Sequence, residues 1–141
     1  MDLTDGEFEQ LLALRTGLRR FVRWSEEQAK ATGITPAQHQ LMLAVRGHKG
    51  PGDPTIGELA NDLLLRPHSA SELIDRAAAA GLISRTPDPG NASIVRIVLT
   101  PLGNDKLRAL SAAHLQELAQ LGPTMRTLWR AIERFEKERL A

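Results

Sequence analysis

The chain has 141 residues, of which 42% are apolar and 25% are charged, so it is long enough to bury the core of one globular domain. It contains no cysteine, which excludes disulfides, thiolate nucleophiles and cysteine-based zinc sites. The formal net charge is only +1, so any affinity for nucleic acid must come from local patches of charge.

The N-terminal sequence and the hydropathy of the chain predict where in the cell the protein is located. The first ten residues, MDLTDGEFEQ, are acidic and lack the apolar run of a signal peptide. No stretch is long and apolar enough to span a bilayer, so we expect a cytoplasmic protein without a membrane partner. Aromatic residues are scarce, with three Phe, two Trp and no Tyr, which argues against a stacking platform for single-stranded nucleic acid.

Residues that cap helices divide the chain into six expected helices. The Thr-x-x-Glu/Gln spacing of a capping box, in which two side chains satisfy free backbone N–H groups, occurs three times. Gly33 and Gly81 are placed to end two helices. The helices are expected at about residues 6–32, 36–46, 56–64, 67–80, 101–121 and 123–140, with capping boxes at Thr4–Glu7, Thr35–Gln38 and Thr55–Glu58.

A β-hairpin is expected between the fourth and fifth helices. Residues 94–99 alternate as a β-strand does, with Val95, Ile97 and Leu99 on one face. The sequence DPGN at residues 88–91 has Pro second and Gly third, which predicts a type II turn. A short helix, a tight connection, a second helix and a following hairpin together make a winged helix-turn-helix.

We therefore expect a mostly α-helical (α+β) fold in a single domain over residues 1–141. The winged helix-turn-helix lobe with its two-stranded wing covers residues 35–100, and residues 1–33 and 101–141 supply flanking helices for dimerisation. These helices carry apolar stripes that either pack on their own domain or, as we favour, interleave with a second chain in a homodimer. The residues predicted to form the dimer interface are Phe8, Leu11, Leu12, Leu128, Trp129 and Ile132.

The fourth expected helix is the candidate recognition helix. Ala70, Leu73, Ile74 and Ala77 recur at helical spacing and are expected to face the core. The opposite face is polar, and the N-terminal part of the second helix of a helix-turn-helix enters the major groove, where Ser and His can donate or accept hydrogen bonds. The candidate DNA-binding residues here are Arg66, Pro67, His68, Ser69, Ser71, Glu72 and Arg76.

Glu72 has three alternative roles that the sequence leaves open. Its carboxylate can accept a hydrogen bond from the amino group of a cytosine. It can instead pair with Arg76, four residues later on the same helix. Ser69 and Glu72 also have the spacing of a capping box, in which the carboxylate turns back to the backbone.

The run from TPAQHQLMLAV through TIGELANDLLLRPHSASELIDRAAAAGLISRTPDPGNASIVRIVLTPLGNDKL, roughly residues 35–107, resembles the MarR family of bacterial transcription regulators. The resemblance is carried by ELA in the third expected helix, GLI after the fourth, Arg85 before the wing, and LTPLG leading into the fifth. It implies a homodimeric winged helix-turn-helix that binds pseudo-palindromic, double-stranded operator DNA. It also implies that a small, often phenolic, effector binds between the dimer arms and the DNA-binding lobe and releases the DNA.

Two positions depart from the family pattern. The family wing usually carries Asp-x-Arg at its tip, whose Arg enters the minor groove, whereas this chain has Asn91-Ala92-Ser93. The family also often has a basic residue where this chain has Glu72. We expect Arg66, Arg85 and Arg96 to compensate by contacting phosphates. The predicted DNA contacts of the hairpin are Arg85, Asn91, Ser93 and Arg96.

The predicted function is a dimeric DNA-binding regulator, a repressor of a pseudo-palindromic operator, with a small-molecule effector as a further expected partner. The alternative is a winged-helix dimer that has lost DNA binding and holds a partner protein. No nucleophile–base set and no paired carboxylates are present, so we predict no enzyme, no catalytic residue and no cofactor. The four histidines, His39, His48, His68 and His114, are widely spaced and predict no metal site.

Overall fold

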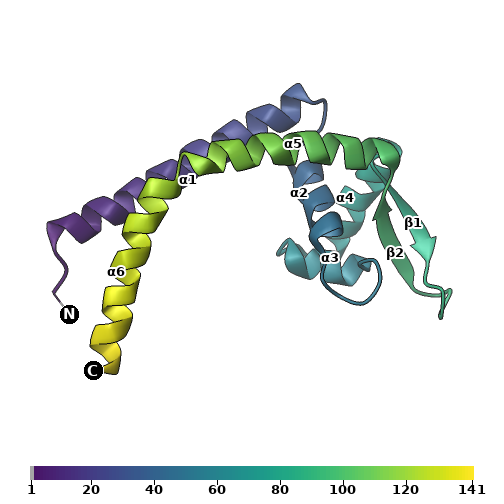
Figure 1. Cartoon of the computed structure of the whole chain (residues 1–141). Helices are drawn as coiled ribbons and strands as arrows, with labels where there is room; N and C mark the ends of the chain where they lie inside the picture. Colours follow the sequence, from purple (N-terminus) through teal and green to yellow (C-terminus); the bar gives the residue numbers. More distant parts are fainter. Residues whose placement is uncertain (1) are drawn as a thin grey trace. The chain divides into compact units, whose positions relative to one another are not determined.

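The computed structural model describes residues 2–141, which form six helices and one two-stranded antiparallel sheet (Figure 1). The expected mostly α-helical fold with a two-stranded wing is confirmed, and every helix lies close to its expected bounds. In chain order the elements are α1 (Asp5–Ala31), α2 (Pro36–Gly47), α3 (Ile56–Asp62), α4 (Pro67–Ala79), β1 (Ile83–Pro87), β2 (Val95–Leu99), α5 (Pro101–Ala119) and α6 (Gly122–Leu140).

The three predicted capping boxes form. The hydroxyl of Thr35 accepts a hydrogen bond from the backbone N–H of Gln38 at 3.1 Å, and the Gln38 side chain accepts one from the N–H of Thr35 at 3.0 Å. These reciprocal bonds satisfy donors that an α-helix leaves free in its first turn. The same exchange joins Thr4 with Glu7 before α1 and Thr55 with Glu58 before α3.

Three glycines occupy positions where any other residue would strain the backbone or clash with it. Gly33 (φ +82°) and Gly81 (φ +76°) follow α1 and α4 in the left-handed region, as expected for residues that end helices. Gly103, in the first turn of α5, is buried, and a Cβ there would lie 2.0 Å from the carbonyl oxygen of Leu82. The absence of a side chain therefore allows α5 to approach the backbone at the start of β1.

The chain divides into two compact units, residues 28–111 and residues 2–27 with 112–141. In the first unit, Leu41, Leu59, Ile74 and Ile97 are each at most 1% exposed and join α2, α3, α4 and β2 in one core. Burying such a side chain stabilises the folded state by about 1.5–3 kcal/mol. This burial determines which face of each helix is exposed to solvent. A second core in this unit consists of Ala29, Ile34, Met42, Leu82, Leu107 and Leu110.

The second unit contains a small cluster of aromatic and polar side chains from α1 and α5. The rings of Trp24 and His114 lie edge to face with centroids 4.8 Å apart, and Phe21 packs on both rings. The buried hydroxyl of Ser25 lies 2.6 Å from His114 Nε2. These contacts join the two helices within this unit.

The hairpin of β1 and β2, which we call the wing, pairs Arg85 with Ile97 and Thr86 with Arg96. An isolated bridge between Thr55 and Arg96 adds the end of the α2–α3 loop (residues 48–55) to the outer side of β2. The predicted type II turn is wrong: it requires a positive φ at Gly90, which is not among the described glycines with positive φ. Instead, both Gly90 and Asn91 donate backbone hydrogen bonds to the Asp88 carboxylate, in the manner of an Asx turn.

Candidate nucleic-acid interface

The outward face of α4 is fixed by how the helix begins and what it buries. Pro67 occupies the first turn, where its missing N–H costs nothing, and Arg66 is the N-cap residue. Ala70, Ile74 and Ala77 are at most 1% exposed, so the predicted inward face is confirmed. The opposite side, the α4 outer face, is exposed and consists of His68, Ser69, Glu72, Asp75 and Arg76, with Ser71 half-buried at its edge.

The pairing of Glu72 differs from both intramolecular alternatives drawn from the sequence. Its carboxylate lies 3.1 Å from His68 Nε2, one turn earlier, rather than pairing with Arg76. The capping box with Ser69 is wrong because α4 begins two residues before Ser69. The His68 and Glu72 side chains are 86% and 56% exposed, and such surface pairs contribute about 0–1 kcal/mol. A base can therefore compete for either side chain, and that contact stays a prediction.

Arg85 on β1 lies beside the outer face of α4. Its guanidinium forms an ion pair and hydrogen bond with the carboxylate of Asp75. The Arg85 and Asp75 side chains are 39% and 66% exposed, so solvent screens the pair and a phosphate can compete for the guanidinium. The predicted phosphate contact of Arg85 is compatible with this position.

The tip of the wing is ordered by its own side chains and carries no cation. Asn91 Oδ1 accepts hydrogen bonds from the backbone N–H of Ser93 at 3.1 Å and from its hydroxyl at 2.6 Å. Residues 86–95 include no Lys or Arg. Asn91 and Ser93 are exposed, as a DNA contact requires, but neither brings positive charge to the tip.

Arg96 is placed differently from the other candidate arginines. Its Nε donates to Asp88 Oδ1 at 2.5 Å, and its Nη1 donates to the carbonyl of Asp53 at 2.6 Å. The Arg96 and Asp88 side chains are only 19% and 17% exposed. This geometry argues against the predicted phosphate contact, because a carboxylate and a backbone carbonyl already accept hydrogen bonds from the guanidinium.

Sequence reasoning missed Leu64, in the tight connection between α3 and α4. Leu64 has φ +54° and is 92% exposed. Its N–H bonds to the carbonyl of Asn61 and that of Leu65 to Ala60, which makes a Schellman-type end for α3 with Leu64 where glycine is usual. A run of three leucines at a helix end does not predict this conformation, because nothing in the sequence indicates which of them adopts a positive φ.

The outer helices expose much of their apolar stripes within the single chain. Phe8, Leu12 and Trp129 are 57%, 64% and 59% exposed. Leu11 and Ile132 are also exposed, whereas Leu128 is half-buried. Packing within their own chain therefore leaves most of the predicted interface residues uncovered.

Comparison with known proteins identifies the lobe that carries α4 and most of the wing. Residues 32–92 match the model of the MarR family. This lobe is therefore similar to the MarR family. The HTH-type transcriptional regulator YsmB of Bacillus subtilis is 42% identical over 52 residues, which are 37% of this chain and 36% of YsmB. The HTH-type transcriptional repressor MdtR of the same organism is 25% identical over 126 residues, 81% of this chain and 79% of MdtR.

Solved structures of MarR proteins share the fold over nearly the whole chain. A MarR family protein from Bacillus stearothermophilus has a TM-score of 0.72 at 23% identity, covering 99% of this chain and 100% of that one. MepR of Staphylococcus aureus in complex with DNA has a TM-score of 0.69 at 15% identity, covering 97% and 99%. These likenesses show that the chain shares the fold of the two solved proteins.

Neither a group of metal-ligating side chains nor a membrane-spanning helix lies along residues 2–141. No group of three or more histidine or acidic side chains in this range is arranged to hold a metal ion. None of the helices in the same range is long and apolar enough to cross a membrane.

Proposed function

We propose that this chain is a homodimeric regulator of the MarR family that binds a pseudo-palindromic operator in double-stranded DNA and represses transcription. The observation that carries the proposal is the α4 outer face: an exposed polar surface on a helix whose opposite side is locked in the core. In a helix-turn-helix, this is the surface that enters the major groove. A protein that acts on chromosomal DNA in this way works in the cytoplasm.

The contacts in this proposal divide into base readout and phosphate binding. His68, Ser69 and Ser71, in the first turns of α4, meet base edges, and Glu72 can accept from a cytosine amino group. Pro67 packs at the groove entrance. Phosphates are bound by Arg76 on the α4 outer face and by Arg66 and Arg85 beside it. The wing tip approaches the flanking backbone through Asn91 and Ser93.

Homodimerisation is proposed from the exposed apolar side chains of α1 and α6. Phe8, Leu12 and Trp129 are each more than half exposed, and large apolar surfaces of this kind mark interaction sites. A two-fold dimer buries the same surface of both chains and presents two copies of α4. The half-sites on the DNA are then about one helical turn apart, or a multiple of that spacing.

The repressor role is inferred from a similar protein, and the existence of an effector is inferred from the family resemblance. MdtR, which aligns over most of this chain, is named a transcriptional repressor. The effector, a small molecule, follows from the family resemblance.

A second function is favoured by two specific observations. The wing tip has no cation over residues 86–95, and Glu72 places a carboxylate on the α4 outer face. A winged-helix dimer that holds a partner protein instead of DNA explains both features. It predicts no salt-dependent affinity for duplex DNA.

Selection of binding sites from a pool of random duplex DNA separates the two functions. Enrichment of an inverted repeat supports the regulator. A folded, dimeric protein that enriches no sequence favours the protein-binding alternative. The matched control is the Ser69→Ala/Ser71→Ala double variant, which keeps the helix but removes two base contacts and should lose the enrichment.

A further inference from the structure

Arg96 joins three segments that are distant in sequence. From β2, its Nε donates to the Asp88 carboxylate at the start of the wing tip, 2.5 Å away. Its Nη1 donates to the carbonyl of Asp53 at 2.6 Å and lies 3.4 Å from that of Pro51, both in the α2–α3 loop. One guanidinium therefore connects the wing tip to a loop more than 40 residues earlier.

The α2–α3 loop is shaped around this guanidinium. Gly52 has φ +73°, and a Cβ at this position would lie 3.3 Å from Arg96 Nη1. The next residues continue the association, because the N–H of Ile97 donates to the carbonyl of Pro54 at 2.8 Å. The end of the loop thus lies beside β2, where Thr55 forms an isolated bridge with Arg96.

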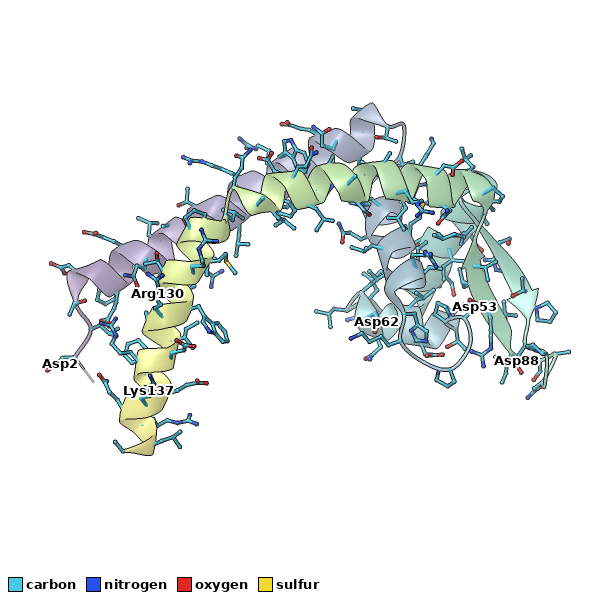
Figure 2. All side chains as sticks on the ribbon, viewed as in Figure 1. Asp2, Asp53, Asp62, Asp88, Arg130 and Lys137 are labelled. Atoms are coloured by element: carbon cyan, nitrogen blue, oxygen red, sulfur yellow. The ribbon has the colours of Figure 1, made fainter. Side chains whose placement is uncertain are left out.

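Asp88 couples this contact to the conformation of the tip. While Oδ1 accepts from Arg96, Oδ2 accepts from the backbone N–H groups of Gly90 and Asn91 at 3.0 and 2.9 Å. Loss of either partner of the Asp88–Arg96 pair therefore loosens both the tip and its attachment to the loop. Figure 2 labels Asp88 near the turn of the wing and Asp53 in the loop beside it.

We propose that Arg96 is a positioning residue, not a phosphate ligand: with Asp88 it fixes the wing against the α2–α3 loop. This inference rests on the proposed DNA-binding function. The wing then acts as a rigid arm whose tip, which carries no cation, meets DNA at a fixed position. Because a mobile arm loses more conformational entropy when it binds, fixing the arm in advance strengthens binding without adding a charge.

The direction in which Asp88→Asn changes the affinity for DNA distinguishes the two possible roles of Arg96. If Arg96 bound phosphate, Asp88→Asn would release it and remove a negative charge near the DNA, so affinity would rise or stay level. If Arg96 positions the wing, Asp88→Asn and Arg96→Ala each weaken binding to the selected duplex, by about tenfold, and the double variant is no weaker than either. The slope of log K against log salt stays unchanged, whereas loss of a phosphate contact reduces it by about 0.9 per contact.

A second measurement uses the free protein. Amide hydrogen exchange at Gly90 and Asn91 should accelerate in both single variants, while the amides of α4 keep their protection and show that the lobe remains folded. Asp75→Asn is the matched control, because it removes the partner of Arg85 rather than that of Arg96 and should leave the amides of Gly90 and Asn91 unchanged. Arg96→Lys, which keeps the charge but loses the geometry of the guanidinium, should restore protection only in part.

The possible results distinguish a failure of this inference from a failure of the proposed function. Tighter binding by Asp88→Asn, a reduced salt slope in Arg96→Ala, or unchanged wing exchange in either variant would overturn the positioning role. If the wild-type protein binds no duplex, the proposed function fails, and the exchange data alone decide whether the Asp88–Arg96 pair fixes the wing.

Discussion

Arg85 on β1 and Asp75 on α4 form an ion pair that links the wing to the candidate recognition helix. Both side chains are exposed enough for solvent to screen the pair. In the proposed complex, Arg85 exchanges this carboxylate for a DNA phosphate. Its role is therefore opposite to that of Arg96, whose carboxylate partner is largely buried.

The Arg85→Ala substitution should weaken binding to all duplex sequences alike. Since a dimer loses two phosphate contacts, the salt slope should fall in magnitude by about two. Fluorescence anisotropy at several salt concentrations measures both quantities. Asp75→Asn is the control: it keeps the cation, and its affinity should equal or exceed that of the wild type. A change only in which sequence is preferred would contradict the backbone role of Arg85.

The Ser93→Arg substitution should tighten DNA binding by restoring a cation at the wing tip. We expect an affinity gain of about tenfold and a salt slope steeper by about two for the dimer. Ser84→Arg adds the same charge to an exposed position on β1, away from the tip, and should give a smaller gain. Equal gains from both variants would mean that the tip does not reach the DNA.

The Leu64→Asn substitution should stabilise the protein. Leu64 is 92% exposed, so the change removes little packing, and its positive φ costs leucine about 1 kcal/mol that asparagine tolerates better. We expect a gain of about 0.5–1 kcal/mol, or about 2–4 °C in Tm. Thermal unfolding followed by circular dichroism measures it. A lower Tm would mean that the leucine side chain stabilises the folded state.

The Trp129→Glu substitution should convert the dimer to monomers. It places a charge in an apolar stripe that the proposed interface buries, which costs several kcal/mol unless the charge is paired. Sedimentation equilibrium measures the mass. Leu64→Asn, an exposed change outside the stripe, is the control and should remain a dimer. A dimer that survives Trp129→Glu would place the interface elsewhere.

The order of the wing should depend on pH through Asp88. The hydrogen bond from Arg96 holds the pKa of Asp88 below its ordinary value of 3.8; partial burial opposes this shift, and the N–H groups of Gly90 and Asn91 support it. A lowered folded-state pKa gives stability that is present above the ordinary pKa and lost as pH falls through the lowered one.

Amide chemical shifts at the wing tip should therefore follow a single titration whose midpoint lies below 3.8. The Asp88→Asn variant should lack this transition. A midpoint at or above 3.8 in the wild type would contradict the Asp88–Arg96 pair.

The helices were predictable because their signals are local. In each capping box, the residues that bond are three apart, as Thr35 and Gln38 are, so the sequence places both partners. The inward face of α4 follows from the spacing of Ala70, Ile74 and Ala77. These features depend on helical geometry and need no knowledge of the tertiary fold.

The wing was less predictable because two local preferences compete there. Pro89-Gly90 suits a type II turn, but the Asp88 carboxylate accepts bonds from the two following N–H donors and selects another conformation. The contacts of Arg96 could not be predicted, because its partner carbonyl, at Asp53, is 43 residues away. The phosphate role assigned to Arg96 followed from its charge alone.

The most direct test is a salt-dependent binding titration of the selected inverted repeat, with the stoichiometry measured on the same sample. The account predicts two chains per duplex, an affinity that falls steeply as salt rises, and much weaker binding to a scrambled duplex of the same composition. Equal affinity for both duplexes, or binding that does not respond to salt, would contradict a sequence-reading DNA-binding dimer.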